Sequence, residues 1–205
     1  EHVTIAVSGT HGGHTIDFTE TLSDPRAQRG WQVQGGGTFM ITFESNTETR
    51  EITSEEFKNY LDEHGLYGIK SEIDSMGGYV SEAFTSYAKL LVQVGSQRDE
   101  TFSSILGTPI EIVPLSNPQM YKVGDMVEFR ILANKKPVFG ARVRVLNRHD
   151  NRVTEQNIFS QQDGVIETRI SSGGAWMISV LNVIPSTHIA TDWESHRASL
   201  VFGIQ

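Results

Sequence analysis

The chain has 205 residues, no cysteine and a formal net charge of −8 at pH 7. The lack of cysteine excludes disulfides and thiolate sites, so a metal ion would be held by imidazole, carboxylate or backbone oxygen. The negative charge, with no basic stripe, argues against a nucleic-acid or anionic-membrane partner, and no apolar run approaches the ~18 residues of a membrane span.

The N-terminal part predicts short strands separated by glycine-containing turns. Residues His2–Ser8 alternate between apolar and polar side chains, which is typical of a half-buried strand. A loop with the sequence GTHGGHT follows. Residues Trp31–Val33 and Thr38–Glu44 then predict two strands around the glycine run Gly35–Gly37.

One helix is predicted near residues 53–64, within the segment Ile52–Leu66. Thr53 and Glu56 form a capping box, and Gly65 supplies the left-handed residue that ends a helix. His64, beside that glycine, is interpreted as a last-turn residue that contacts exposed carbonyls rather than as a general base.

The segment after this helix predicts a second short helix over Val80–Tyr87 and then a strand over Tyr87–Val94. In that strand the apolar residues Ala88, Leu90, Val92 and Val94 fall on one side.

From Thr108 onward the pattern changes to about seven short strands, the spacing of a β-sandwich. The predicted strands are Ile110–Leu115, Met126–Leu132, Ala141–Asn147, Val153–Phe159, Val165–Ile170, Ala175–Ile184 and Ala198–Ile204. The sequence therefore predicts a mainly β protein. An N-terminal β-rich domain (residues 1–107) with one or two short helices precedes a C-terminal antiparallel β-sandwich (residues 108–205) of the immunoglobulin or transthyretin type.

Several segments in series carry a resemblance to a known family. They are SEEFKNYLDEHGL (54–66), SYAKLLVQVG (86–95), GTPIEIVPLSNP (107–118), the Asp163-Gly164 turn, GAW (174–176) and DWESHRASLVF (192–202). In this order they resemble an uncharacterised bacterial family described as a periplasmic component of nickel or cobalt uptake systems. The resemblance implies a transthyretin- or carboxypeptidase-regulatory-like C-terminal sandwich, export behind a signal peptide, and a transition-metal ligand. Residues 1–50 match the family poorly.

His11 and His14 are the main candidate metal ligands. The two glycines between them allow backbone conformations that turn both imidazoles towards one ion, and imidazole suits Ni, Co, Cu or Zn. Asp17 or Glu20 could complete the ligand shell, and His2 could join it if the first strand doubles back. The alternative is a flexible surface loop with incidental histidines.

His188, Asp192 and His196 form a second candidate group. Their spacing would place all three on one side of a helix, but Pro185–Ala190 does not favour a helix. Trp193 is interpreted instead as a large ring that fills the end of the sandwich.

No nucleophile elbow and no phosphate-binding loop is present, so an enzyme is not expected. The sequence favours an exported, non-enzymatic binding protein whose possible cofactor or cargo is a divalent transition metal, nickel or cobalt, delivered to membrane uptake components. The alternative is a structural or interaction module of the cell envelope that binds protein or carbohydrate, marked by exposed aromatic residues such as Tyr121, Phe139 and Trp193. A hydrolase would require a cleft that gathers carboxylates from both halves.

Overall fold

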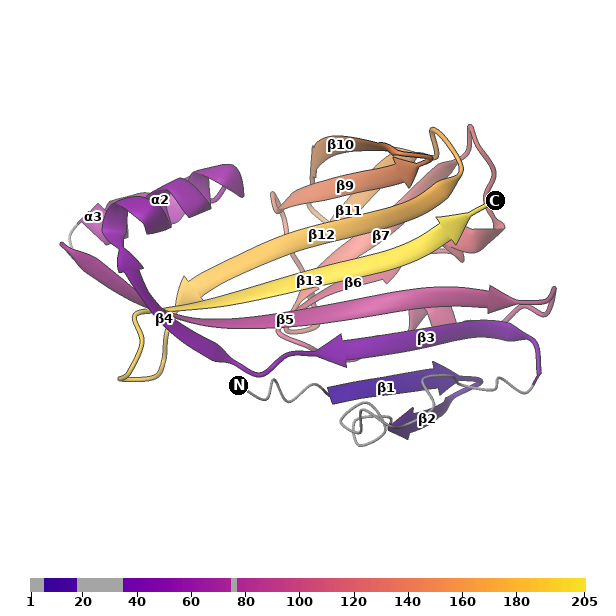
Figure 1. Ribbon diagram of the computed structural model, residues 1–205, viewed down its shortest axis with the longest axis horizontal. Helices are drawn as coiled ribbons and strands as arrows, with labels where there is room; N and C mark the ends of the chain where they lie inside the picture. Colours follow the sequence, from indigo (N-terminus) through magenta and orange to yellow (C-terminus); the bar gives the residue numbers. More distant parts are fainter. Residues whose placement is uncertain (1–5, 18–34, 75–76) are drawn as a thin grey trace.

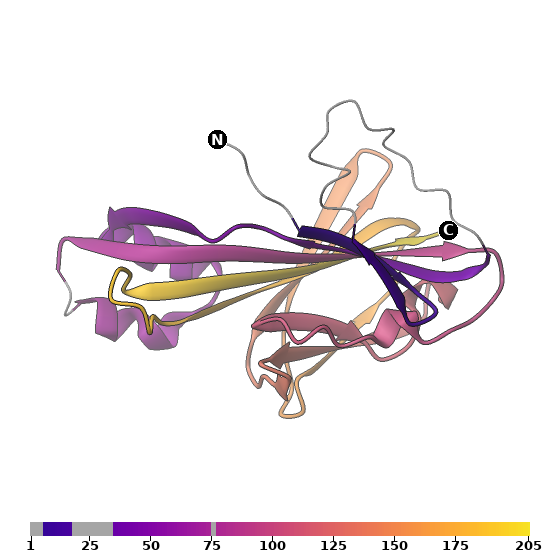
Figure 2. The ribbon, with the colours of Figure 1, turned by 90° about the horizontal axis from the view of Figure 1, so that it is seen from below.

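The computed structural model describes residues 6–17, 35–74 and 77–205 and confirms the mainly β fold class. A large, long-stranded sheet packs against a smaller sheet in a sandwich-like arrangement, and two short α-helices lie at the opposite end of the long strands (Figures 1 and 2). None of the helices in these ranges is both long and apolar enough to cross a membrane.

The larger sheet has nine strands in the described part of the chain. Their order is β10-β9-β12-β13-β5-β3-β1-β2, and β4 pairs with β5 beside this path. The bounds are β1 Ala6–His11, β2 His14–Asp17, β3 Gly37–Glu44, β4 Glu48–Thr53, β5 Tyr79–Val94, β9 Arg142–His149, β10 Arg152–Phe159, β12 Gly174–Pro185 and β13 Trp193–Ile204.

The smaller sheet consists of four strands in the described ranges, in the order β11-β7-β6 with β8 beside β7. The bounds are β6 Ile110–Pro114, β7 Met126–Ala133, β8 Lys136–Pro137 and β11 Val165–Arg169. Short 3-10 turns connect the strands: η1 Tyr67–Ile69, η2 Thr101–Ser103 and η3 Pro118–Met120. The predicted strand positions after Thr108 are therefore confirmed, with ends shifted by one or two residues except in β13 (Trp193–Ile204), which begins five residues before the predicted Ala198.

The predicted helix over Val80–Tyr87 is wrong, because this segment is the first half of β5. Its aromatic and β-branched residues suit a strand. The segment pairs on one side with β4, from Thr53 opposite Tyr79 to Glu48 opposite Phe84. A central strand is stabilised by neighbouring strands that are distant in sequence. The local pattern of apolar residues does not show these neighbours, so it predicted a helix here.

Strand β13 joins the two predicted halves of the chain. It runs parallel to β5, with Trp193 opposite Glu82 and Val201 opposite Leu90, whereas the other strand pairs are antiparallel. The larger sheet is thus continuous across residues 107 and 108. Residues before 107 and after 108 both contribute strands to this one sheet. The division into two domains therefore stays a prediction.

The main core fills the space between the two sheets. Alternate residues of the C-terminal strands point into it, as the sequence predicted. Its largest fully buried side chains include Phe129, Trp176, Phe202, Met40 and Leu91. The Phe129 and Phe202 rings lie 5.7 Å apart, within the range of favourable aromatic pairs.

A second core lies beneath helix α2 (Ser54–Glu63) and helix α3 (Lys70–Asp74). Thr53 caps α2 in the predicted capping box with Glu56. The fully buried Phe57 lies against Trp193, with 6.1 Å between the ring centres. Trp193 is 2% exposed, so its predicted burial is confirmed, although it packs under the helix rather than between the sheets.

Helix α2 ends as the sequence predicted. Gly65 adopts a φ of 72°, and the amide of Leu66 donates to the Leu61 carbonyl. The ring of His64 donates from Nδ1 to the Tyr60 carbonyl at 2.8 Å, which confirms its interpretation as a last-turn residue.

Candidate functional site

The two candidate metal ligands are paired across a tight hairpin. Strands β1 and β2 are joined only by Gly12 and Gly13, whose φ values are 56° and 80°. A two-residue hairpin turn of this kind needs positive φ at both positions, which glycine adopts without steric cost. The register pairs His11 with His14. Directly opposed residues share a face of the hairpin, with Cβ atoms ~4.5–5.5 Å apart.

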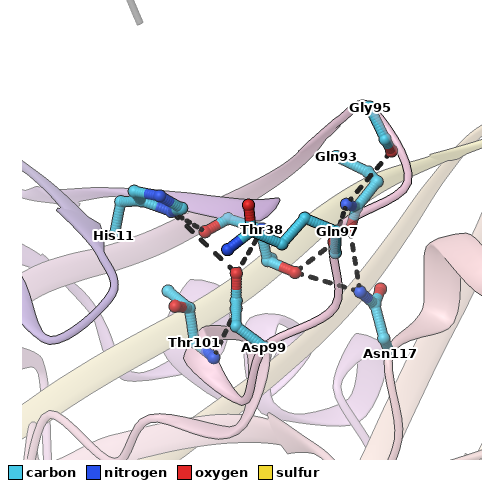
Figure 3. Close-up of polar contacts among 8 residues, drawn as sticks. All are labelled: His11, Thr38, Gln93, Gly95, Gln97, Asp99, Thr101 and Asn117. Carbon is cyan, nitrogen blue, oxygen red and sulfur yellow. Dashed lines mark hydrogen bonds and ion pairs between the residues drawn. The ribbon is translucent and has the colours of Figure 1, made fainter. Parts of the chain in front are cut away.

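His11 is held in place by the neighbouring strand β3. Its Nδ1 lies 3.0 Å from the Thr38 carbonyl oxygen (Figure 3). Its ring stacks on Phe39, with 3.9 Å between ring centres and 13° between ring planes. Because a carbonyl only accepts hydrogen bonds, Nδ1 carries the proton in this contact. The other ring nitrogen, Nε2, is then the one with a lone pair for an ion.

Asp99 supports the same backbone position from a distant loop. Its carboxylate accepts hydrogen bonds from the amides of Thr38 (2.8 Å) and Thr101 (2.9 Å), and Oδ2 lies 4.0 Å from His11 Nδ1. Burial raises the pKa of Asp99, but the donors, chiefly the amides of Thr101 and Thr38, outweigh it and hold the pKa below its ordinary value. The carboxylate is therefore charged at neutral pH beside His11.

The side chain of Thr38 belongs to a further polar network. Asn117 donates from Nδ2 to Thr38 Oγ1 (3.0 Å) and to Gln93 Oε1 (3.1 Å), and Gln93 donates to the carbonyls of Gly95 and Gln97 (Figure 3). These contacts connect β3, β5, the loop after β5 and η3. They fix the backbone that orients His11.

Gly37 makes the close approach of His11 and Asp99 possible. A Cβ atom at this position would lie 2.3 Å from Asp99 Oδ2 and 2.7 Å from His11 Cε1. Asp99 was not among the predicted site residues, because it lies far along the chain from the histidines and no local motif connects it to them.

The remaining candidates around this hairpin are not gathered with the histidine pair. Asp17 lies on β2 three residues after His14, so their side chains point to opposite faces of the strand. His2 and Glu20 lie outside the described residues. Over residues 6–17, 35–74 and 77–205, no group of three or more His, Asp or Glu side chains could hold a metal ion. The assignment of His11 and His14 as ligands stays a prediction.

The C-terminal candidates do not lie on a helix. Asp192 accepts hydrogen bonds at one oxygen, Oδ2, from the Ser81 amide (2.8 Å) and hydroxyl (2.6 Å), which tie the loop before β13 to β5. His188 is solvent-exposed in that loop. His196 lies on β13, where the helical spacing does not apply, and its Nε2 is 3.6 Å from Glu194. The three residues thus lie on a loop and a strand, where Glu194 lies near both histidines and Asp192 is bound to Ser81.

His196 is half-buried on the strand. Burial lowers its pKa below the ordinary value, although Glu194 opposes the shift. Its Nδ1 is buried and has no hydrogen-bond partner in the described part of the chain.

A groove of about 410 Å³ opens between the first strands and the start of the smaller sheet. At its floor the ammonium of Lys89 contacts Glu111 at 2.5 Å, and both side chains are almost fully buried. Glu111 also accepts from the amides of Leu106 (2.7 Å) and Gly107 (3.0 Å). This carboxylate is fully engaged, so we interpret the pair as structural.

The groove bears on the hydrolase alternative. It does bring carboxylates of both halves together, Asp17 and Glu44 from the first and Glu111 from the second. Asp17 and Glu44 are solvent-exposed, whereas Glu111 is neutralised by Lys89. The groove therefore does not supply a paired acid and base drawn from the two halves.

Comparison with known proteins assigns the chain to a family. The sequence model of a domain of unknown function, DUF4198, matches residues 3–184. The chain belongs to this family. The match begins at residue 3, so the expectation that residues 1–50 match the family poorly is wrong. It includes the first hairpin, β5 and most of the sandwich, but it carries no statement about a metal. Comparisons with curated proteins and with solved structures give no significant match.

The aromatic residues named for an interaction module do not form one exposed cluster. Phe139 is 74% exposed, whereas Trp193 is buried beneath α2 and Tyr121 packs against the main core. These three residues therefore do not form the exposed aromatic cluster that would favour an interaction module.

Proposed function

We propose that this DUF4198 protein is an exported, non-enzymatic protein that binds a divalent transition metal, nickel or cobalt by resemblance, at the first hairpin. The observation that carries the proposal is the register that pairs His11 with His14 across the Gly12-Gly13 turn. Two imidazoles on one face of a hairpin are at the right separation to share an ion, because metal–nitrogen bonds are about 2.0–2.1 Å.

The contacts of His11 support the proposal further. Histidines that bind metals usually donate the second ring N–H to a carbonyl or a carboxylate, which fixes the ring and its tautomer. His11 makes this contact with the Thr38 carbonyl, and Asp99 lies beside it. Two imidazoles leave coordination positions open, which suits an ion that is passed to membrane uptake components rather than retained.

Titration calorimetry with Ni²⁺, Co²⁺, Zn²⁺ and Cu²⁺ tests the proposal. We expect one saturable site, loss of it in His11→Ala and in His14→Ala, and weakening of ~10–100-fold in Asp99→Asn, the range for outer-shell partners. His149→Ala is the matched control, because His149 is exposed at the end of β9. Absence of saturable binding, or equal binding by the wild type and the His11→Ala/His14→Ala double variant, would reject the metal site.

A further inference from the structure

A second cavity, of about 400 Å³, lies between the end of α2 and strands β9, β12 and β13. It is on the face of the larger sheet that points away from the smaller sheet, because its strand residues, except Val180, alternate with those of the main core. It shares no residue with the first hairpin. Its lining includes Tyr60, His64, Arg142, Arg144, Arg197 and Ser179.

The strand register places the arginines around small hydroxyl residues. Ser179 of β12 is paired with Arg144 on one side and with Ser199 on the other. Arg197 is paired with Leu181 two positions further along β12, on the same face. The two serines leave room between the guanidinium groups, so the floor of the cavity is short and polar while its sides are basic.

The positive charge of this cavity is only partly compensated. Arg144 forms a two-point contact with Glu155 (3.0 and 2.9 Å), and Arg142 donates to the Glu63 carbonyl at the end of α2 (3.0 Å). The guanidinium of Arg197 lies 5.3 Å from the centre of the Phe84 ring, and no ion pair involves it in the described part of the chain. Glu63 is the one carboxylate among the residues that line the cavity, and the buried Glu82, which pairs with Arg50, lies near Tyr60.

The helical wall of the cavity orients Arg197. The hydroxyl of Tyr60 is completely buried, so a ligand in the cavity does not reach it, and it lies beside the guanidinium of Arg197. Burial, followed by the charge of Glu82, raises the pKa of Tyr60, so the hydroxyl keeps its proton. The Tyr60 hydroxyl occupies one side of the guanidinium, whose five N–H groups leave further donors for a ligand.

We propose that this cavity binds a small oxyanion, a carboxylate or phosphate group, through the guanidinium of Arg197, which Tyr60 holds in place. Guanidinium groups match the planar oxygens of carboxylate and phosphate and form the stronger, charge-assisted hydrogen bonds. Arg144 and Arg142, held by their own partners, supply the surrounding positive field. The proposal is independent of the metal site, because the two sites have no residue in common.

Calorimetric titration with inorganic phosphate and with succinate, in low-chloride buffer, tests the site and distinguishes the two oxyanion classes. We expect saturable binding of at least one of them and a loss of at least about tenfold in affinity in Arg197→Gln. Arg169→Gln, an exposed arginine on β11 of the other sheet, is the matched control and should bind as the wild type does.

A second variant keeps the test decisive if Arg197→Gln does not fold. Ser179→Glu places a carboxylate on the floor of the cavity, where it should occupy the anion position and abolish binding of the added probe. Saturable binding that both variants retain would overturn the proposal, as would the absence of saturable binding of either probe by the wild type.

Discussion

Replacing Glu111 with Leu should strongly destabilise the protein, because it leaves the ammonium of Lys89 buried without a counter-charge. Lys89 is 6% exposed, and its other contacts are the carbonyls of Ser104 (3.2 Å) and Ile112 (3.3 Å). Burial lowers the pKa of Lys89 even with Glu111 present, which shows how poorly the site solvates a cation. Breaking a buried ion pair from one side costs about 3–5 kcal/mol.

The amides that Glu111 also binds should add little to this cost. They belong to Leu106 and Gly107, in a segment that is open to water, so water can replace the carboxylate there. The expected loss of about 3–5 kcal/mol is a large share of the ~5–15 kcal/mol of stability of a typical domain.

Guanidinium unfolding followed by circular dichroism measures the effect. In a double-mutant cycle with Lys89→Met, the double variant should be more stable than the sum of the single losses by about 2 kcal/mol or more, because neither charge is left alone. Lys58→Met is the control: its ion pair with Asp74 is largely exposed and should contribute less than about 1 kcal/mol. A loss below about 1 kcal/mol in Glu111→Leu, or additivity in the cycle, would refute the reasoning.

Two further predictions concern the backbone and the pH dependence. Gly174→Ala should lower the free energy of unfolding by about 3 kcal/mol or more in thermal unfolding, because φ is 96° and the new Cβ would lie 2.3 Å from the Arg148 carbonyl oxygen. Gly140→Ala, where φ is 72° and the space is open, should lower it by only ~1–2 kcal/mol. Equal losses in the two variants would contradict this. Folding lowers the pKa of His196, so the unfolded chain binds more protons between that lowered value and 6.5, and stability should fall as pH decreases through this window. His196→Gln should show a smaller decrease between pH 7.5 and 5.5 than the wild type or His149→Gln; an unchanged decrease would argue against it.

Patterns that depend on near neighbours were predicted well. The alternation in Met126–Leu132 and Ala198–Ile204 located strands β7 and β13, because one side of each strand packs in the core. The capping box of Thr53 and Glu56 located the start of α2, because its hydrogen bonds are local.

Features that depend on distant partners were not predicted. Ala88, Leu90 and Val92 do fall on one side of β5, but Leu90 and Val92 are each 38% exposed, while Lys89 points inward. A lysine is expected at the surface unless a counter-charge is available, and Glu111 comes from the other sheet.

In the candidate site, too, the local features were predicted and those that depend on distant residues were not. The His-Gly-Gly-His spacing was visible in the sequence, and the hairpin that pairs the two histidines follows from the conformational freedom of glycine. The contact of His11 with Thr38 and the nearby carboxylate of Asp99 require the assembled sheet. The arginine cavity also requires it, because its charges come from separate strands.

The position of β13 has a consequence for how the protein assembles. This strand comes last along the described chain, yet it occupies the middle of the larger sheet, between β12 and β5. Until Trp193–Ile204 is inserted, those two neighbours each expose an unpaired edge, which is prone to wrong pairings with other chains. Pairing β13 with β5 also closes a loop of about a hundred residues, an entropic cost that slows folding. Newly synthesised chains thus depend on this strand to complete the sheet, and a variant that lacks it is expected to aggregate rather than to keep partial activity.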